Sequence, residues 1–231
     1  MRRAALVAPC RTAVGTFGGS LRLLTADQLA AHIMKACLDR AQLDGKHVDE
    51  VIVAQSYASS EAPCIGRYAA LLAGLPVEVP GYTLDRRCGS GLQAVIDAAM
   101  MVQTGAADVV LVTGVESMSN IEYYSTDMRW GSRSGSVAMH DRLQRGRERS
   151  QPVERFGVIS GMPETAENLA REYGISRAAS DAFALRSHHR AAAAWREGRF
   201  TDEVVAIDVP QGKGKIVRFE RDEGVRADAT M

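Results

Sequence analysis

The sequence has no excess of charge of either sign, because 28 lysines and arginines balance 28 aspartates and glutamates among its 231 residues. Binding to nucleic acid phosphates usually requires a basic excess, so nucleic acid is not expected as a partner. The sequence also has no apolar run long enough to cross a bilayer. Two arginines stand at the start, but the apolar run behind them is too short for a signal peptide. These features predict a cytoplasmic protein without a membrane segment.

Cysteines are few and far apart, at positions 10, 37, 64 and 88. No two of them form a Cys-x-x-Cys pair, so neither a metal site nor a redox pair of that kind is predicted. In the cytoplasm such cysteines would be free thiols, and most free cysteines pack as small apolar side chains. We prefer that interpretation for Cys10, Cys37 and Cys64.

The first half of the chain alternates short apolar runs with helical patterns. Strands are predicted over residues 4–8, 51–54, 82–86 and 109–113, and helices from residue 25, over 65–73 and over 92–102. The last of these helices is apolar on most faces and is expected to be buried. Alternation of this kind is typical of a mostly parallel sheet with helices on both faces. The pattern predicts an α/β domain with the order βαβαβαβ over residues 1–117.

The chain changes character after residue 117. Residues 120–155 are rich in arginine, glycine and serine and predict long loops. Two helices are expected over 164–173 and 176–197, because Pro163 suits a first helical position and Ser176 suits a cap. A hairpin is expected over 204–209 and 215–219. We interpret residues 118–231 as an inserted loop, or cap, domain with little core. No closing element precedes the last residue, so we expect the chain to be incomplete.

Cys88 lies where a predicted strand meets a predicted helix, within Arg87-Cys88-Gly89-Ser90-Gly91. The N-terminus of a helix carries a partial positive charge and unpaired N–H groups, and both favour the nucleophilic thiolate. The glycines leave room for an incoming group and permit a tight turn. Neither the papain-type signature nor the Gly-x-Ser-x-Gly elbow fits the segment. On local chemistry alone, a nucleophile and a packed thiol both remain open.

Several segments, taken in order along the chain, resemble those of the thiolase family. Residues 87–94 resemble the motif around the active-site cysteine of that family. The other matching segments are residues 9–19, 69–76, 114–119, 161–168 and 180–184, followed by Asp222, Glu223 and Arg226. The resemblance therefore covers nearly the whole chain.

The resemblance implies a thiolase fold, in which an N-terminal half with an inserted loop domain precedes a similar C-terminal half, absent here. It implies that Cys88 is the acylated nucleophile, that Arg226 contacts coenzyme A and that Met162 lines the acyl pocket. Acyl-CoA and coenzyme A would be substrates in fatty acid metabolism, with no permanent cofactor or metal. The assembly would be a homodimer or homotetramer.

The chain also departs from the family pattern. Gly161 and Pro163 replace a histidine and a glycine found in many relatives, and both changes touch the expected acyl pocket. The activating histidine and a second catalytic cysteine belong to the absent C-terminal half of the family. We interpret His188 and His189 as surface or packing residues of a helix.

Other functions stay open at this point. A second interpretation is a related acyl-CoA condensing enzyme, such as a ketoacyl synthase or a lipid-carrier thiolase-like protein. It could also be an inactive half that serves as a binding or dimerisation module, and alone it is expected to turn over slowly. Arg226 could be an ordinary surface residue and Met162 an ordinary packing residue.

Overall fold

A computed structural model describes residues 2–159 and 161–231 of the chain. The chain forms two compact units. The first unit comprises Met1–Asn120 with Phe200–Gly224, and the second comprises Ile121–Arg199 with Val225–Met231. Residues 200–224 thus group with the first unit, although we expected all of 118–231 to form one region. The division into domains at residue 117 stays a prediction.

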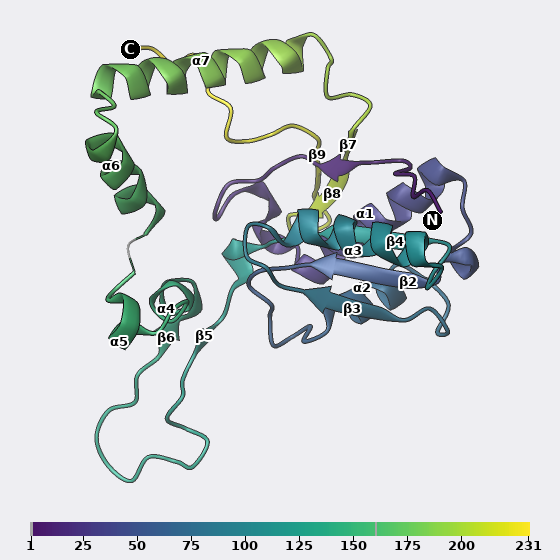
Figure 1. Cartoon of the computed structure of the whole chain (residues 1–231), viewed down its shortest axis with the longest axis horizontal. Coiled ribbons are helices and arrows are strands. Elements are labelled where there is room, and N and C mark those ends of the chain that lie inside the picture. Colours follow the sequence, from purple (N-terminus) through teal and green to yellow (C-terminus); the bar gives the residue numbers. More distant parts are fainter. Residues whose placement is uncertain (1, 160) are drawn as a thin grey trace. The chain divides into compact units, whose positions relative to one another are not determined.

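A three-stranded parallel sheet forms the centre of the first unit, as Figure 1 shows. Its strands are β2 (Glu50–Ala54), β3 (Gly81–Leu84) and β4 (Val110–Gly114), in the order β3-β2-β4. In the register of the sheet, Ile52 pairs with Tyr82 on one side and with Val112 on the other. The helices α1 (Ala26–Ala41), α2 (Ile65–Leu72) and α3 (Ser90–Thr104) cover its two faces. The layered α/β fold class is therefore confirmed.

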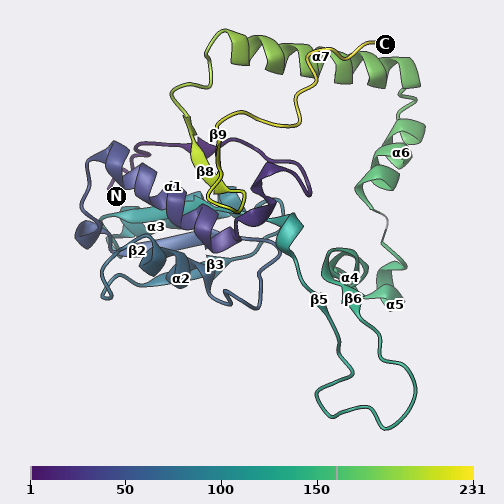
Figure 2. The same cartoon turned by 180° about the vertical axis from the view of Figure 1, so that it is seen from behind.

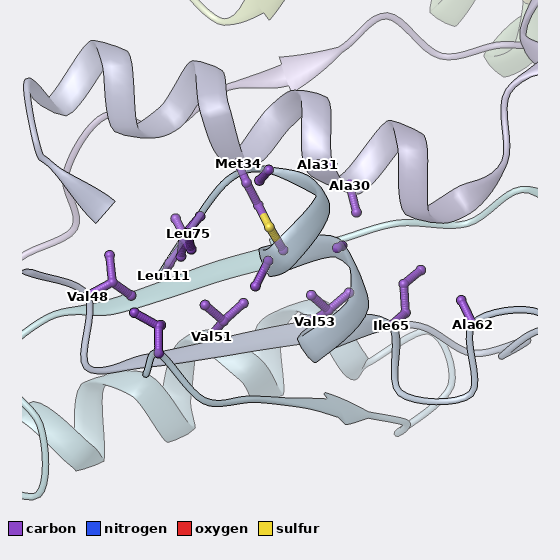
Figure 3. Close-up of a cluster of buried hydrophobic side chains, with 14 residues drawn as sticks. Ala30, Ala31, Met34, Val48, Val51, Val53, Ala62, Ile65, Leu75 and Leu111 are labelled. Carbon is purple, nitrogen blue, oxygen red and sulfur yellow. The ribbon is translucent and has the colours of Figure 1, made fainter. Parts of the chain in front are cut away.

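The side chains of β2 alternate between the two layers of core. Val51 and Val53 point toward α1 and α2, where they pack with Met34 and Ile65 in the cluster drawn in Figure 3. Ile52 and Ala54 join the opposite cluster with Ala94 and Ala98 of α3. Because both faces of this strand are covered, its sequence is apolar throughout, and this is why it could be predicted.

The strand predicted over residues 4–8 is wrong. These residues form no strand, the side chains of Leu6 and Val7 are exposed, and Ala8 has a φ of +51°. A left-handed residue interrupts an extended segment, and no neighbouring strand pairs with it among the described residues. The first strand is instead β1 (Arg11–Thr12), which pairs in parallel with β7 (Val204–Val205).

Helix α3 forms as predicted, but it is not buried on most faces. Only its small residues Ser90, Ala94 and Ala98 are buried, at a spacing of four. Leu92, Ile96 and Met100, also four apart, lie on an exposed face. Residues four apart share one face of a helix, so the small residues contact the sheet and the large ones point outward.

The predicted hairpin is confirmed as β8 (Ile207–Pro210) and β9 (Ile216–Phe219), which are antiparallel. Val209 and Phe219 pack with Ala13 and Leu29, so the hairpin covers the start of α1. The short 3₁₀ helices η1 (Ser20–Leu23), η2 (Gly45–His47) and η3 (Met118–Asn120) complete the first unit.

Two consecutive carboxylates after this hairpin hold the segment that leads into α1. Asp222 accepts hydrogen bonds from the Arg11 guanidinium at 2.8 and 3.2 Å and from the Val14 N–H at 2.7 Å. Glu223 accepts from the N–H groups of Thr16, at 2.8 Å, and Ser20, at 3.0 Å, and from both hydroxyls. Asp222 and Glu223, which are among the residues that resemble the thiolase family, thus have a structural role in this chain.

We expect Glu223→Gln to reduce stability at neutral pH by about 1 kcal/mol, because the charged acceptor of several hydrogen bonds is lost. The hydrogen bond from Ser20, followed by that from the Thr16 N–H, lowers the pKa of Glu223 below its ordinary value. A carboxylate whose pKa is lower in the folded state than in the unfolded state stabilises the protein at pH values above its unfolded-state pKa. That stabilisation is lost as the pH falls through its folded-state pKa. The difference between variant and wild type should therefore shrink below about pH 4, as urea unfolding at several pH values would measure. Glu220→Gln is the control, and a pH-independent difference would contradict the prediction.

The second unit contains mainly helices. They are α4 (Arg142–Glu148), α5 (Val153–Phe156), α6 (Met162–Glu172) and α7 (Arg177–Arg196), with the short antiparallel strands β5 (Tyr123–Tyr124) and β6 (His140–Asp141). The Ser176 hydroxyl accepts from the Ala179 N–H at 3.2 Å, so the predicted cap is confirmed. The long loops predicted over 120–155 are partly wrong, since α4 and α5 lie within them.

The second unit has little core of its own. None of its described residues is buried in a hydrophobic cluster. Among the described residues of both units, no helix combines the length and the apolar character needed to cross a membrane.

Candidate active site

The carboxyl ends of the three parallel strands meet at one edge of the sheet. Residues 55–57 follow β2, residues 85–88 follow β3, and residues 115–116 follow β4. Ligands of open α/β sheets bind at this edge, because the loops there converge around the ends of the strands. Cys88 is the thiol that the fold places on it.

A tight turn connects β3 to α3 and presents Cys88. The buried Ser90 hydroxyl accepts from the Arg86 N–H and donates to the Arg87 carbonyl, each at 2.7 Å. Arg87 has a φ of +52°, whereas Gly89 has an ordinary φ of −87°. The left-handed position of the turn thus belongs to Arg87, and Gly89 contributes by its missing side chain, because a Cβ there would lie 3.3 Å from the Arg86 carbonyl oxygen. A non-glycine residue held at positive φ beside a reactive group is typical of functional sites.

Space is open in front of the turn. The Cys88 side chain is exposed, and a Cβ added to Gly91 would meet no atom within 4 Å. Within the described residues, the N–H groups of Gly91 and Leu92 in the first turn of α3 have no backbone or side-chain acceptor. Such N–H groups can bind an anion or a carbonyl oxygen that gains charge. A carbonyl compound can therefore approach the sulfur beside available donors.

Contacts between the three loops fix the conformation of Arg87. Its guanidinium donates to the Ser56 carbonyl at 2.9 Å and lies over the Tyr57 ring, 5.6 Å from the centroid. The Glu116 carboxylate in turn accepts from the N–H groups of Ser56, at 2.9 Å, and Tyr57, at 3.1 Å. Glu116 therefore positions the loop after β2, which supports Arg87 and through it Cys88.

We expect Glu116→Gln to slow alkylation of Cys88 by iodoacetamide by about tenfold, because an amide offers only one acceptor atom for two N–H groups. Labelling rates would be followed by peptide mass spectrometry in the same sample as Cys64, whose rate should not change. Glu61→Gln, an exposed change on the same long loop, is the matched control. Equal Cys88 rates in the two variants would contradict the role of Glu116.

Sequence reasoning did not assign a role to Glu116 or Tyr57. Glu116 directly follows the end of β4 and lies in a segment that resembles the family, and this signal could have identified it. Gln55, directly after β2, is 2% exposed, and its Oε1 atom has no hydrogen-bond partner among residues 2–159 and 161–231. Nothing in its own sequence context marks it.

Cys64 shows that a helix start alone does not distinguish Cys88. Cys64 is also exposed and immediately precedes a helix, α2. Its thiol, however, donates to the Gly81 carbonyl at 3.6 Å, and it lies away from the carboxyl ends of the strands. The position of Cys88 at the convergence of three loops is therefore what singles it out.

Met162 and Arg226 belong to the second unit, whereas Cys88 belongs to the first. Met162 begins α6 with an exposed side chain, and the Arg226 N–H donates to His188 Nδ1 at 3.2 Å. The proposed roles of these two residues stay predictions. His189 contacts the Ala229 carbonyl at 3.0 Å, so both histidines of α7 contact backbone groups of the C-terminal segment.

A cavity of about 1120 Å³ in the first unit is not lined by Cys88. It is lined by the N-terminal segment, α1, β4 and α3, and among the three site loops it reaches Val115 and Glu116. We assign the candidate site from the convergence of loops rather than from this cavity. The described residues contain no cluster of side chains that could hold a metal ion.

The fold and the site define a layered α/β protein that presents a cysteine at the carboxyl edge of a parallel sheet. A family model described as the N-terminal domain of thiolase matches residues 4–231. The chain belongs to the thiolase family and corresponds to its N-terminal part.

Relatives and a solved structure agree with this assignment. The chain is 38% identical to an acetyl-CoA acetyltransferase and 39% identical to beta-ketothiolase BktB, both of Cupriavidus necator, over 98% and 100% of its length. It is 40% identical to an acetyl-CoA acetyltransferase of Pseudomonas aeruginosa. It spans 56–58% of the length of these relatives. The crystal structure of the Bacillus anthracis acetyl-CoA acetyltransferase matches 99% of this chain, with a TM-score of 0.89 and 38% sequence identity. The match covers 56% of the chain in that crystal structure.

Proposed function

We propose that the protein is an acyl-CoA acyltransferase that works through an acyl group carried on Cys88. The observation that supports this most directly is the exposed thiol at the carboxyl edge of the sheet, with open space and unpaired N–H groups beside it. The names of the relatives supply the substrate class, coenzyme A thioesters. Thiolytic cleavage of a 3-ketoacyl-CoA and condensation of acetyl-CoA are the two directions of this chemistry.

In the cleavage direction, the Cys88 thiolate attacks the ketone carbon of a 3-ketoacyl-CoA. The bond between that carbon and the adjacent α-carbon of the thioester breaks. The α-carbon leaves as the acetyl-CoA carbanion, which takes up a proton. The acyl group then forms a thioester with Cys88. The thiolate of coenzyme A attacks this thioester, so that a shortened acyl-CoA leaves and the Cys88 thiolate is regenerated.

The chain supplies three elements to these steps. The turn after β3 fixes the sulfur, the N–H groups of Gly91 and Leu92 would stabilise the oxyanion, and Glu116 positions the supporting loop. Met162 would line the acyl pocket and Arg226 would contact the phosphates of coenzyme A, for which a guanidinium is well suited. We further propose a cytoplasmic homodimer or homotetramer, with coenzyme A as substrate rather than bound cofactor.

Trapping of the acyl group tests this proposal. The intact protein would be incubated with acetyl-CoA, quenched in acid and digested, and the peptide that contains residue 88 would be examined by mass spectrometry. We expect one acetyl group on Cys88 and none on Cys64. Acetylation of both cysteines to the same extent, or of neither, would overturn the proposal. Measured cleavage of acetoacetyl-CoA would separate a thiolase from related condensing enzymes.

A further inference from the structure

Two of the remaining cysteines come together from separate elements of the first unit. Cys10 immediately precedes β1, and Cys37 lies in the last turns of α1. The Cys37 thiol donates to the Ala8 carbonyl at 3.5 Å, so it reaches the backbone two residues before Cys10. The two thiols lie close enough together that each affects the pKa of the other. This pair is independent of Cys88.

The surroundings keep both thiols neutral. Burial raises the pKa of Cys10, and Arg40 opposes this only in part. Burial likewise raises the pKa of Cys37, and the neighbouring Cys10 raises it further. Two protonated thiols can lie in contact without the repulsion that two thiolates would have. The arrangement is therefore a stable dithiol in the reduced protein.

The dithiol is reachable, and the two segments that carry it are held together. Both cysteines line the cavity of about 1120 Å³ in the first unit. The Arg40 side chain, one turn from Cys37, donates to the Pro9 carbonyl at 3.4 Å and to the Asp202 carbonyl at 2.6 Å. These contacts hold the segment that carries Cys10 against α1, which carries Cys37.

We propose that Cys10 and Cys37 form a redox-sensitive dithiol site that a small disulfide, such as glutathione disulfide, oxidises to an intramolecular disulfide. One cysteine, as thiolate, attacks the small disulfide and releases one glutathione thiolate, which leaves a mixed disulfide. The second cysteine then attacks the protein sulfur of that mixed disulfide and releases the second glutathione. Two protein thiols are oxidised and one disulfide is reduced to two thiols, so atoms and electrons balance.

The bond would connect the N-terminal segment covalently, but reversibly, to α1. The two cysteines are 27 positions apart in the sequence, so the cross-link closes a long loop in the unfolded chain. A cross-link of this kind stabilises the folded state chiefly by restricting the unfolded one. Because the thiols have raised pKa values, the reaction should be slow at neutral pH and faster in alkaline solution.

Peptide mapping of the intact protein tests the proposal. The protein would be equilibrated with glutathione disulfide, the remaining thiols blocked with an alkylating agent, and trypsin used to release residues 4–11 and 36–40. We expect these two peptides joined by a disulfide, and a thermal midpoint several degrees above that of the reduced protein. Reduction should abolish both effects.

Matched variants make the outcome decisive. Cys10→Ala and Cys37→Ala should each lose the joined peptide and the rise in thermal midpoint, whereas Cys64→Ala should keep both. Circular dichroism would check that each variant is folded, and Cys10→Ser and Cys37→Ser replace any variant that is not. Recovery of residues 10 and 37 only as free thiols, as separate mixed disulfides, or joined to other cysteines would overturn the proposal.

Discussion

Replacing Cys88 with alanine should lower the rate of acyl transfer from an acyl-CoA by about a thousandfold or more, because the covalent step then has no nucleophile. The geometry gives no second thiol that could take its place. Cys64 is the other exposed cysteine, and its thiol donates to the Gly81 carbonyl of β3. Cys10 and Cys37 are half-buried, and the pKa of the Cys37 thiol is raised by its burial and by Cys10. The effect is measured as the rate at which the intact protein consumes acetoacetyl-CoA, followed by absorbance.

Controls separate chemistry from folding in this experiment. Cys88→Ser keeps the size of the side chain but supplies a much weaker nucleophile, so it should lose activity nearly as fully. Cys64→Ala removes another exposed thiol at a helix start and should keep the wild-type rate. All three variants should bind coenzyme A. If Cys88→Ala retained more than about a tenth of the wild-type rate, the covalent mechanism would be wrong.

Sequence patterns predicted the central sheet because its strands are covered on both faces. The apolar runs at 51–54 and 109–113 match β2 and β4. Residues 4–8 are likewise apolar, yet they form no strand. These segments differ in whether a neighbouring strand is available rather than in residue type, since a strand forms only where another strand pairs with it. A local pattern carries no information about that partner.

The candidate site was predictable only in part for the same reason. Cys88 could be identified because the strand, the thiol and the helix follow one another in the sequence. The support of Arg87 depends on Ser56 and Tyr57, and these depend on Glu116, about 60 positions away from them in the chain. Contacts over such separations follow from the order β3-β2-β4 of the sheet, which sequence patterns left unspecified.

A single methyl group at Gly66 should destabilise the protein by about 3 kcal/mol, the upper part of the range for overpacked sites. Gly66 lies in the first turn of α2, where the helix backbone approaches β3. A Cβ there would lie 2.1 Å from the Tyr82 carbonyl oxygen and 2.8 Å from the Tyr82 nitrogen. Tyr82 cannot move away easily, because it is paired with Ile52 in the sheet. Relief therefore requires a shift of the whole helix, which packs Ile65 and Ala69 in the core.

Gly91→Ala is a matched control for Gly66→Ala, because Gly91 is likewise the second residue of its helix, α3. A Cβ on Gly91 meets no atom within 4 Å, so only the helix preference of alanine remains. That preference should stabilise the protein by about 0.5 to 1 kcal/mol. Urea unfolding of both variants measures the contrast, with opposite signs expected. Equal effects would mean that α2 does not approach β3 as closely as the structure shows. The turn before Cys88 would then lack the rigid strand that positions it, because β3 leads directly into that turn.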